Sequence, residues 1–275
     1  MQNNKVYWEN KKERKEHAIA HTEQMEHDFD SKIERSVRGA QIYDDHVFNG
    51  LLVLANERKA KITVENLTTV EAIKKYQASS LQDFKDYKNM LVLNFASYKN
   101  PGGKFMQGSF AQEESLCHES FLYNVLKRFD TSYYAQNRFY TNKCLYRDIA
   151  IFTPYILFQE FNENGDERWA ADVLSCAAPN YKAAKRYYNV TWEENLAALK
   201  SRIQFVMRIA LIQQPRILIL GAFGCGVFGQ DPNVVASIFK DCIYNTTYQP
   251  EQIVFAIPYN FHKENYEAFE KVFCQ

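Results

Sequence analysis

The 275-residue chain has few glycines and no obvious means of holding a metal or crossing a membrane. Glycine occurs ten times, about half its usual frequency. The six cysteines form no CxxC pair and lack zinc-ligand spacing, which favours free thiols in a reducing compartment. No apolar run approaches the ~18 residues of a membrane span, and the N-terminus has no signal-peptide core. We therefore expect a cytoplasmic protein without a metal or redox cofactor.

The chain also has no excess of positive or negative charge. Lys plus Arg and Asp plus Glu each number 33, so the neutral chain has no general attraction to nucleic acid or to anionic membranes. Residues 1–36 are nevertheless highly charged and contain no proline. We expect them to form an N-terminal helical extension, with a solvated helix from Glu9 to Glu26 followed by a looser arm. Residues 37–275 contain no proline- or glycine-rich linker and are expected to form one domain.

Apolar runs and helix signals alternate along the second half of the chain. The runs at 216–222 and 252–258 are largely apolar rather than alternating, which predicts strands buried on both faces. A capping box at Thr191 and an Asp-Pro start at 231–232 each predict the beginning of a helix. We predict an α/β fold, a three-layer α/β/α sandwich with a mixed sheet. Further strands are expected at 51–55, 61–67, 90–97, 149–158 and 170–180, and further helices at 68–77, 112–129 and 263–273.

The few glycines gather in two places. Seven of the ten lie in the segments NPGGKFMQGS (100–109) and LGAFGCGVFGQDP (220–232). Each segment follows a predicted buried strand and precedes a helix, where glycine lets a ligand approach the backbone and free N–H groups attract a negative group. Two such loops in one sheet predict a cleft that binds a diphosphate. The plainer alternative is that each loop needs glycine only for its turns, and neither segment matches a Walker A or GxGxxG motif.

A pair of glutamates opens the helix after the first glycine segment. Glu113 and Glu114 follow Gln112, and acidic residues are common in a first helical turn because they complement the helix dipole. Glycosidic chemistry needs a carboxyl group that protonates a leaving oxygen and a carboxylate that orients the sugar. Adjacent helical residues point about 100° apart, so this pair would contact different hydroxyls of one ribose. Because the dipole favours the anion, an acid here requires desolvation that raises its pKa.

The segment LNFASYKNPGGKFMQGSFAQEESLC (93–117) resembles the signature of bacterial-type poly(ADP-ribose) glycohydrolases, which have a macrodomain fold. That family carries a glycine triplet followed after a short spacer by Gln-Glu-Glu, and the second glycine segment resembles its second phosphate loop. The similarity covers roughly residues 30–270 in element order. It implies a hydrolase that cleaves the glycosidic bond of the distal ribose in poly(ADP-ribose) or ADP-ribosylated macromolecules, releasing ADP-ribose.

The resemblance also implies roles for single residues. Glu114 would be the catalytic acid/base, and Glu113 would hold the ribose hydroxyls. The residues implied in binding the distal ribose and the diphosphate are Asn94, Gly102, Gly103, Gln112, Gly224, Cys225, Gly226, Val227 and Phe228. The expected partners are ADP-ribose or ADP-ribosylated protein or polymer, with nucleic acid only as a modified substrate, no membrane, and a monomeric enzyme.

Two positions depart from the family pattern. Lys104 stands at the third glycine of the triplet, and Gln230 stands where the family often has Asn. A Lys104 side chain that points at the ligand would force the loop to shift; otherwise it adds a charge beside a phosphate or faces water. Two alternatives stay open at this point: a macrodomain that binds ADP-ribose without cleaving it, and a hydrolase of small phosphorylated or acylated ADP-ribose derivatives.

Other chemically notable residues favour structural interpretations. Ser175 and Cys176 lie in an apolar strand and are expected in the core, and Cys225 has no implied His partner that would make it a nucleophile. His262 follows the last strand, where it would lie at the surface or line the cleft. The segment YKAAKRYY (181–188) gathers three tyrosines and three basic residues. A solvated loop is its favoured interpretation, and contact with nucleic acid or polymer phosphates is the alternative.

Overall fold

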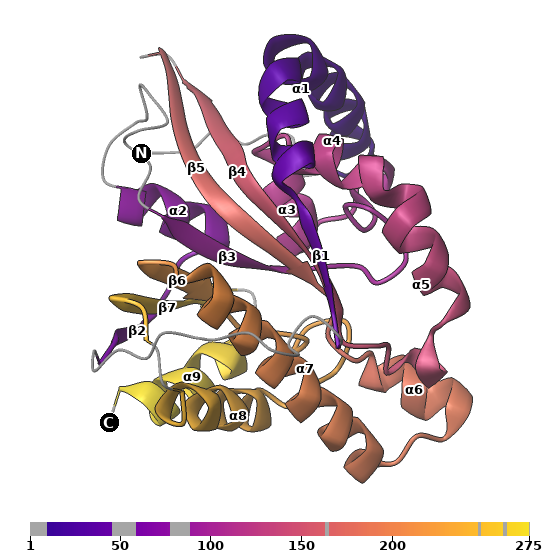
Figure 1. Cartoon of the computed structure of the whole chain (residues 1–275), viewed down its shortest axis with the longest axis vertical. Helices are drawn as coiled ribbons and strands as arrows, with labels where there is room; N and C mark the ends of the chain where they lie inside the picture. Colours follow the sequence, from indigo (N-terminus) through magenta and orange to yellow (C-terminus); the bar gives the residue numbers. More distant parts are fainter. Residues whose placement is uncertain are drawn as a thin grey trace.

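A computed structural model of the chain describes residues 10–45, 59–77, 89–162, 165–246, 249–260 and 263–274. The strand predicted at 51–55 and the residue His262 lie outside these ranges. The strands are β1 (Gln41–Asp44), β2 (Lys61–Glu65), β3 (Met90–Phe95), β4 (Ile149–Asn162), β5 (Gly165–Cys176), β6 (Ile217–Leu220) and β7 (Gln252–Ala256). They form a seven-stranded sheet in the order β1-β4-β5-β3-β6-β7-β2 (Figure 1). β4 pairs antiparallel with β1 and β5, whereas the other neighbours are parallel, so the predicted mixed sheet is confirmed.

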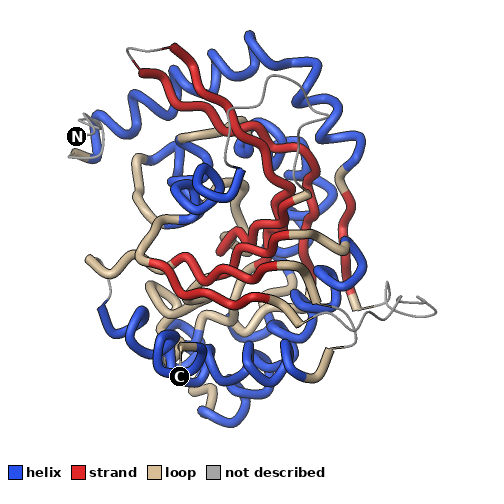
Figure 2. The backbone as a smooth tube through the Cα atoms, turned by 90° about the vertical axis from the view of Figure 1, so that its left-hand side faces the viewer, coloured by secondary structure: helices blue, strands red, loops and turns tan. Residues whose placement is uncertain are grey.

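Helices cover both faces of this sheet (Figure 2). The α-helices are α1 (Lys11–Gly39), α2 (Thr69–Gln77), α3 (Gln112–His118), α4 (Leu122–Leu126), α5 (Ala135–Phe139), α6 (Tyr181–Tyr188), α7 (Trp192–Gln213), α8 (Pro232–Tyr244) and α9 (Lys263–Phe273). Short 3-10 or π turns are η3 (Phe105–Gln107), η4 (Lys127–Phe129), η5 (Asp130–Tyr134) and η6 (Asn142–Cys144). One core joins the sheet to α1, α2, α3 and α4, and the other joins it to α7, α8 and α9. The predicted three-layer α/β/α arrangement is therefore confirmed.

Successive residues of the central strands enter opposite cores. Val92 of β3 and Ile219 of β6 lie in the core beneath α1–α4, whereas Leu91 and Leu218 lie in the core beneath α7–α9. All four are at most 1% exposed. Burying such a side chain stabilises the fold by roughly 1.5–3 kcal/mol, which explains why these strands are apolar on both faces. Because both faces are packed, these strands form a rigid support for the loops that follow them.

Local signals placed several helices correctly. Thr191 and Glu194 form the predicted capping box of α7, and Asp231 caps α8 with Pro232 at its first position. The single helix predicted at 112–129 is wrong, because it is divided into α3, α4 and η4. Ser120 interrupts it by forming a β-bridge with Phe158 of β4. A contact with a distant strand thus ends α3 after only seven residues.

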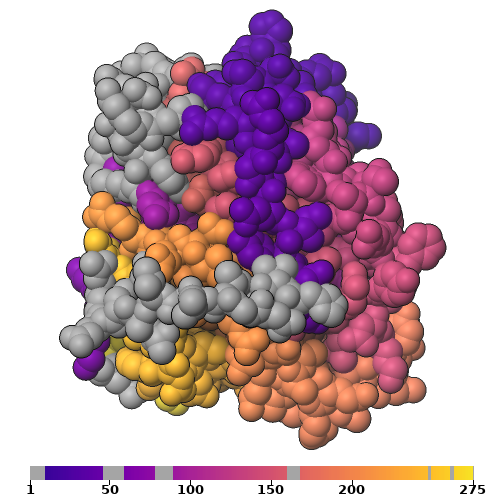
Figure 3. Space-filling view, in the orientation of Figure 1, coloured from indigo at the N-terminus to yellow at the C-terminus, as the bar shows by residue number. Residues whose placement is uncertain are grey.

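The N-terminal extension is more ordered and more buried than its composition suggests. α1 continues from Lys11 to Gly39 with one non-helical residue, Phe29, so the predicted solvated helix with a looser arm is wrong. One stripe of α1 is buried against η3, α4 and β4; it consists of Ala18, His21, Met25, Phe29, Ile33 and Ser36. Figure 3 shows the indigo N-terminal segment at the surface of this face. The spacing of the apolar residues, hidden among many charges, accounts for the difference. The predicted division into two domains at residue 36 falls within the last turn of α1 and stays a prediction.

None of the helices in the described ranges combines the length and the hydrophobicity needed to cross a membrane.

Candidate active site

The two glycine segments follow neighbouring strands of the sheet. β3 and β6 pair in parallel, so the segments that leave their carboxyl ends begin at the same edge, where open α/β sheets bind ligands. The second segment also contacts the end of β3: a Cβ built on Gly221 would lie 2.9 Å from Cζ of Phe95, and the Phe95 and Phe223 rings are 5.7 Å apart. The sequence therefore placed the two loops correctly at equivalent positions.

Glu113 of α3 is buried against the end of β3. Its side chain is 3% exposed; Oε2 accepts a hydrogen bond from the Ser97 N–H (2.7 Å), and Oε1 accepts one from Asn94 Nδ2 (3.4 Å). Burial raises the pKa of the Glu113 carboxyl well above its usual range, and the neighbouring Glu114 charge adds to the rise, although the hydrogen bonds oppose it. The raised pKa thus belongs to the residue implied to hold the ribose hydroxyls.

Glu114 reaches the first glycine segment. Its Oε1 accepts a hydrogen bond from the Lys104 N–H at 2.9 Å, and the residue is 7% exposed. A Cβ added to Gly103 would lie 2.6 Å from Glu114 Oε1 and 2.8 Å from Glu113 Oε2. Gly103 also has a φ of +62°, which L-residues rarely adopt. The two carboxylates thus face one point of the backbone, and only glycine fits there.

Backbone N–H groups of the first segment are directed at protein groups. That of Lys104 binds Glu114 and that of Gly103 binds the Asn100 carbonyl, while the Ser97 N–H just before the segment binds Glu113. Gly102, with a φ of +63°, turns its missing Cβ toward the Tyr123 ring, 2.8 Å away, so its side-chain position faces the interior. This differs from the expected pair of equivalent phosphate cradles, because the first segment positions carboxylates.

The second segment has the character of an anion site. Among the described residues, none accepts a hydrogen bond from the N–H groups of Gly226, Val227 and Phe228, and a Cβ on Gly226 would meet no atom within 4 Å. A run of free N–H groups in a turn binds anions such as phosphate. Cys225 differs from its neighbours, since its N–H is donated to the Ala222 carbonyl at 3.1 Å. Gly224 is required for the turn, with a φ of +79°.

Asn94 and Gln112, both predicted to bind ligand, have different surroundings. Asn94 is fully buried and donates to Ser175 Oγ at 3.0 Å, while its Oδ1 has no hydrogen-bond partner among the described residues. Gln112 donates to the Leu93 carbonyl (2.9 Å) and accepts from the Phe95 N–H (2.8 Å). Its side chain fastens the start of α3 to the end of β3. Binding of a ligand by either residue stays a prediction, and Asn94 alone keeps an unused buried acceptor.

The two departures from the family pattern have structural explanations. Lys104 is exposed, and its φ of −112° suits any residue, so its side chain faces water. Gln230 is buried and donates to the Pro179 carbonyl (2.8 Å) and to Asn195 Oδ1 (2.9 Å), and Asn195 Nδ2 returns a bond to Gln230 Oε1. This amide pair ties the second segment to α7. Sequence reasoning missed Asn195, although a buried polar residue within an apolar helix face would have been a signal.

Aromatic rings connect the two sides of the site. Phe228 of the second segment lies 6.3 Å from the Tyr146 ring, and Tyr146 stacks on Tyr98 with centroids 4.2 Å apart. Tyr98 lies three residues beyond Phe95, the last residue of β3. Sequence reasoning missed Tyr146, because this residue comes from the distant segment between η6 and β4.

Helix α1 packs behind the glutamate helix. His17 Nδ1 lies 3.0 Å from Nδ1 of His118, the last residue of α3, and His21 Nε2 lies 2.9 Å from the Ser120 carbonyl. Arg14 Nε donates to the Gly108 carbonyl at 2.8 Å, so α1 also supports the end of the first glycine segment. Within the described ranges, no group of three or more His, Cys, Asp or Glu side chains is suited to a metal ion.

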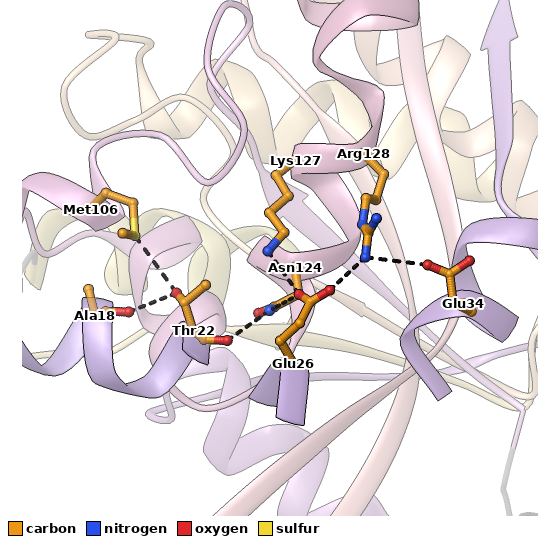
Figure 4. Close-up of polar contacts among 8 residues, drawn as sticks. All are labelled: Ala18, Thr22, Glu26, Glu34, Met106, Asn124, Lys127 and Arg128. Carbon is orange, nitrogen blue, oxygen red and sulfur yellow. Dashed lines mark hydrogen bonds and ion pairs between the residues drawn. The ribbon is translucent and has the colours of Figure 1, made fainter. Parts of the chain in front are cut away.

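Further along α1, Glu26 fixes helix α4 (Figure 4). Its carboxylate accepts hydrogen bonds from Asn124 (2.7 Å), Lys127 (2.8 Å) and Arg128 (2.6 Å). These donors lower the Glu26 pKa against the opposing effect of its burial, which is the largest single influence. The N-terminal helix is therefore part of the support of the site.

The buried histidines predict acid sensitivity. Burial lowers the pKa of His21 to about 4 and that of His118 to about 3. The unfolded chain therefore binds more protons below pH 6.5, so the stability that neutral His21 contributes is full above pH 6.5 and is lost as the pH falls toward 4. We expect the free energy of unfolding to fall by about 2 kcal/mol from His21 alone between pH 7 and pH 5. Urea denaturation at the two pH values measures this.

A His21→Gln variant should reduce that pH dependence, because the amide can still donate to the Ser120 carbonyl without titrating. His27, whose side chain is 88% exposed beside Asp28, provides the control. An equal pH dependence in wild-type protein and His21→Gln would contradict the assignment.

Two further surface features are α6, whose Lys182 N–H donates to the Phe228 carbonyl of the second glycine segment at 3.1 Å, and a hollow between α7 and α8. The segment 181–188 is helix α6, so the predicted loop is wrong, and Tyr187 and Tyr188 on it are 67% and 48% exposed. A hollow of about 330 Å³ between α7 and α8 is lined by Met207, Arg208, Cys242 and neighbours. It contains none of the predicted site residues.

Comparisons with known proteins agree with this geometry. The family model described as "Microbial-type PARG, catalytic domain" matches residues 9–160, more than half of the chain. The structure is similar to poly(ADP-ribose) glycohydrolase (PARG) from Thermomonospora curvata, with a TM-score of 0.80, 27% identity, and coverage of 94% of this chain and 99% of that one. The same enzyme bound to the inhibitor ADP-HPD has a TM-score of 0.78 and 27% identity, with coverage of 94% of this chain and 98% of that one. PARG from Deinococcus radiodurans in complex with ADP-ribose has a TM-score of 0.72 and 27% identity, with coverage of 87% of this chain and 96% of that one. No match was found among curated protein sequences.

Proposed function

The chain belongs to the microbial-type PARG catalytic-domain family and is a glycohydrolase, and we propose that Glu114 is the acid/base with which it releases ADP-ribose. The observation that carries this proposal is the convergence of Glu113 and Glu114 on Gly103, together with a second segment in which three N–H groups bind no described residue. The diphosphate of ADP-ribose would accept hydrogen bonds from those N–H groups. This binding leaves the distal ribose between the second segment and the carboxylates.

The hydrogen bonds of the two glutamates suggest different tasks. Both oxygens of Glu113 accept bonds from protein donors, so Glu113 is suited to holding a fixed position beside the ribose. Glu114 uses Oε1 to bind the Lys104 N–H, and no described residue binds its Oε2. That oxygen is free to protonate the leaving oxygen while the glycosidic bond breaks. Water then attacks the anomeric carbon and returns its proton to Glu114, which completes the hydrolysis.

Two further contacts would support the ribose. Oδ1 of Asn94, buried and without a partner among the described residues, can accept a hydrogen bond from a ribose hydroxyl. The Phe228 ring, held beside Tyr146, would shield the cation-like transition state from water. A positive charge that develops on the sugar is stabilised most strongly by the carboxylate of Glu114, left after proton transfer, when water is excluded.

The non-catalytic alternative depended on Lys104. Its side chain is exposed and its backbone conformation is ordinary, so the contact of its N–H with Glu114 stays intact. Lys104 therefore gives no reason to expect a loss of catalysis. Hydrolysis of a small ADP-ribose derivative is chemically compatible with the same residues, and the choice of substrate therefore needs measurement.

The decisive experiment is incubation of the protein with four substrates: poly(ADP-ribose), ADP-ribosylated protein, ADP-ribosylated DNA and small acylated or phosphorylated ADP-ribose derivatives. Chromatography of the products measures free ADP-ribose. We expect rapid release from the polymer. Release only from the small derivatives would reassign the substrate, and tight ADP-ribose binding without release from any of the four would contradict the proposal.

A further inference from the structure

An exposed aromatic and basic surface borders the site on the side of Tyr146. Phe139, at the end of α5, is 85% exposed and the next residue, Tyr140, is 62% exposed. The guanidinium of Arg147 lies 5.2 Å from the centre of the Tyr140 ring. Single exposed aromatics are ordinary on protein surfaces, but two consecutive ones joined to an arginine form a surface that can stack on a base and bind a phosphate. We call Phe139, Tyr140 and Arg147 the platform.

Direct contacts join the platform to the site. The Tyr98 hydroxyl donates to the Tyr140 carbonyl at 2.9 Å, and Arg147 Nε lies 3.5 Å from the same hydroxyl. Tyr98 in turn stacks on Tyr146, which contacts Phe228 of the second glycine segment. Figure 1 shows α5 close to α6, and the Lys182 N–H of α6 donates to the Phe228 carbonyl at 3.1 Å. Two rings, those of Tyr98 and Tyr146, thus connect the platform to Phe228, which is proposed to shield the distal ribose.

The turn between Tyr140 and Arg147 has a strained backbone that surrounding contacts hold in place. Among the described residues, four of the eight non-glycine residues with positive φ lie in the turn between Tyr140 and Arg147; they are Asn142, Lys143, Cys144 and Tyr146. Each such residue costs of order 1–3 kcal/mol and persists only where surrounding contacts enforce it. Here Asn142 Nδ2 binds the Tyr146 carbonyl at 3.1 Å, and the Asn180 N–H binds the Cys144 carbonyl at 2.9 Å. Such strain is typical of functional sites, and this turn is required to bring Arg147 back over Tyr140.

The charges near the platform favour an anionic partner. Asp130 is bound by both terminal nitrogens of Arg138, and Asp148 is bound by the buried Arg202 at 2.6 Å. Within the described part of the chain, Arg147 therefore contacts aromatic groups and no carboxylate. A weakly hydrated guanidinium over an aromatic ring matches a phosphate next to a base.

We propose that the platform binds the ADP-ribose unit from which the terminal unit is cleaved, so that the enzyme holds two consecutive units of poly(ADP-ribose). The adenine of this unit stacks on Phe139 or Tyr140, and Arg147 binds its diphosphate. This inference rests on the function proposed for the site, because it requires the distal ribose to lie beside Phe228. A single-stranded nucleic acid has similar groups, but the chain has zero net charge, and the platform adjoins the cleavage site.

The test compares one unit with two. In a Glu114→Gln background, calorimetry measures the affinity for monomeric ADP-ribose and for a two-unit ADP-ribose oligomer. We expect the oligomer to bind at least about 10-fold more tightly than the monomer, since one stacked base contributes about 10–100-fold. Phe139→Ser with Tyr140→Ser, and separately Arg147→Gln, should remove most of this advantage and leave monomer affinity unchanged. Arg147→Gln should also reduce the salt dependence of oligomer binding by about one unit of slope.

Matched substitutions on α8 control for loss of any exposed tyrosine or cation. Tyr244 is 64% exposed and Lys240 is exposed, so Tyr244→Ser and Lys240→Gln should keep the full advantage of the oligomer. An advantage that survives the platform substitutions would overturn the proposal, and so would equally tight, platform-dependent binding of a single-stranded oligonucleotide. Failure of the function proposed for the site shows separately, as absence of ADP-ribose release from poly(ADP-ribose) by the wild-type protein.

Discussion

Replacement of Glu114 by Gln is expected to lower the turnover of poly(ADP-ribose) by a factor of about 10²–10⁴, the range of a lost general acid/base. The amide oxygen of Gln can still accept the Lys104 N–H that Glu114 Oε1 binds. The first glycine segment should therefore keep its conformation, and affinity for ADP-ribose should stay within a few-fold. Initial rates of ADP-ribose release and calorimetric titration of ADP-ribose separate the two effects.

The matched control is Glu193→Gln, which removes an exposed glutamate from the first turn of α7. It should leave both rate and affinity unchanged. Wild-type turnover in Glu114→Gln would contradict the assignment of the acid/base. Loss of ADP-ribose binding in the same variant would instead show that the carboxylate charge is needed to hold the ligand.

Sequence reasoning located the two glycine segments and the glutamate pair because their signals are local. A buried strand, a cluster of glycines and a helix start are each set by a few consecutive residues, and they combine only one way in a parallel sheet. The same reasoning placed the caps of α7 and α8 correctly. Local chemistry thus determined where the site lies and which residues open its helices.

What the sequence could not show depends on contacts between distant segments. The end of α3 depends on a bridge between Ser120 and Phe158, and the burial of α1 depends on where α3 and α4 lie. The Tyr98–Tyr146 stack joins a residue that follows β3 to one that precedes β4, 48 positions later in the chain. The different tasks of the two glycine segments follow from hydrogen-bond directions, because the same type of loop can turn its N–H groups inward or outward.

Gly103→Ala is expected to abolish most activity without touching a catalytic side chain. The new Cβ would lie 2.6 Å from Glu114 Oε1 and 2.8 Å from Glu113 Oε2, closer than real Cβ contacts allow, so both carboxylates must move. Displacement of a catalytic group by about 1 Å can cost about 10²-fold in rate, and we expect kcat/KM to fall at least that far. Alanine at a φ of +62° should also lower the free energy of unfolding by about 1–2 kcal/mol.

Two other glycines separate these effects. Gly39→Ala creates a similar clash, 2.7 Å from Cγ of Pro154, far from the glutamates, so it should destabilise the fold while turnover per folded molecule stays at the wild-type level. Gly226→Ala has open space and no positive φ, so its stability should change by less than about 0.5 kcal/mol. Its affinity for ADP-ribose should nevertheless fall, because the methyl group occupies space beside the free N–H groups.

Urea denaturation, ADP-ribose titration and kcat/KM on the three variants measure these differences. Normal kcat/KM in Gly103→Ala would show that the two carboxylates do not act from the positions beside Gly103, and the proposed catalytic geometry would then be wrong.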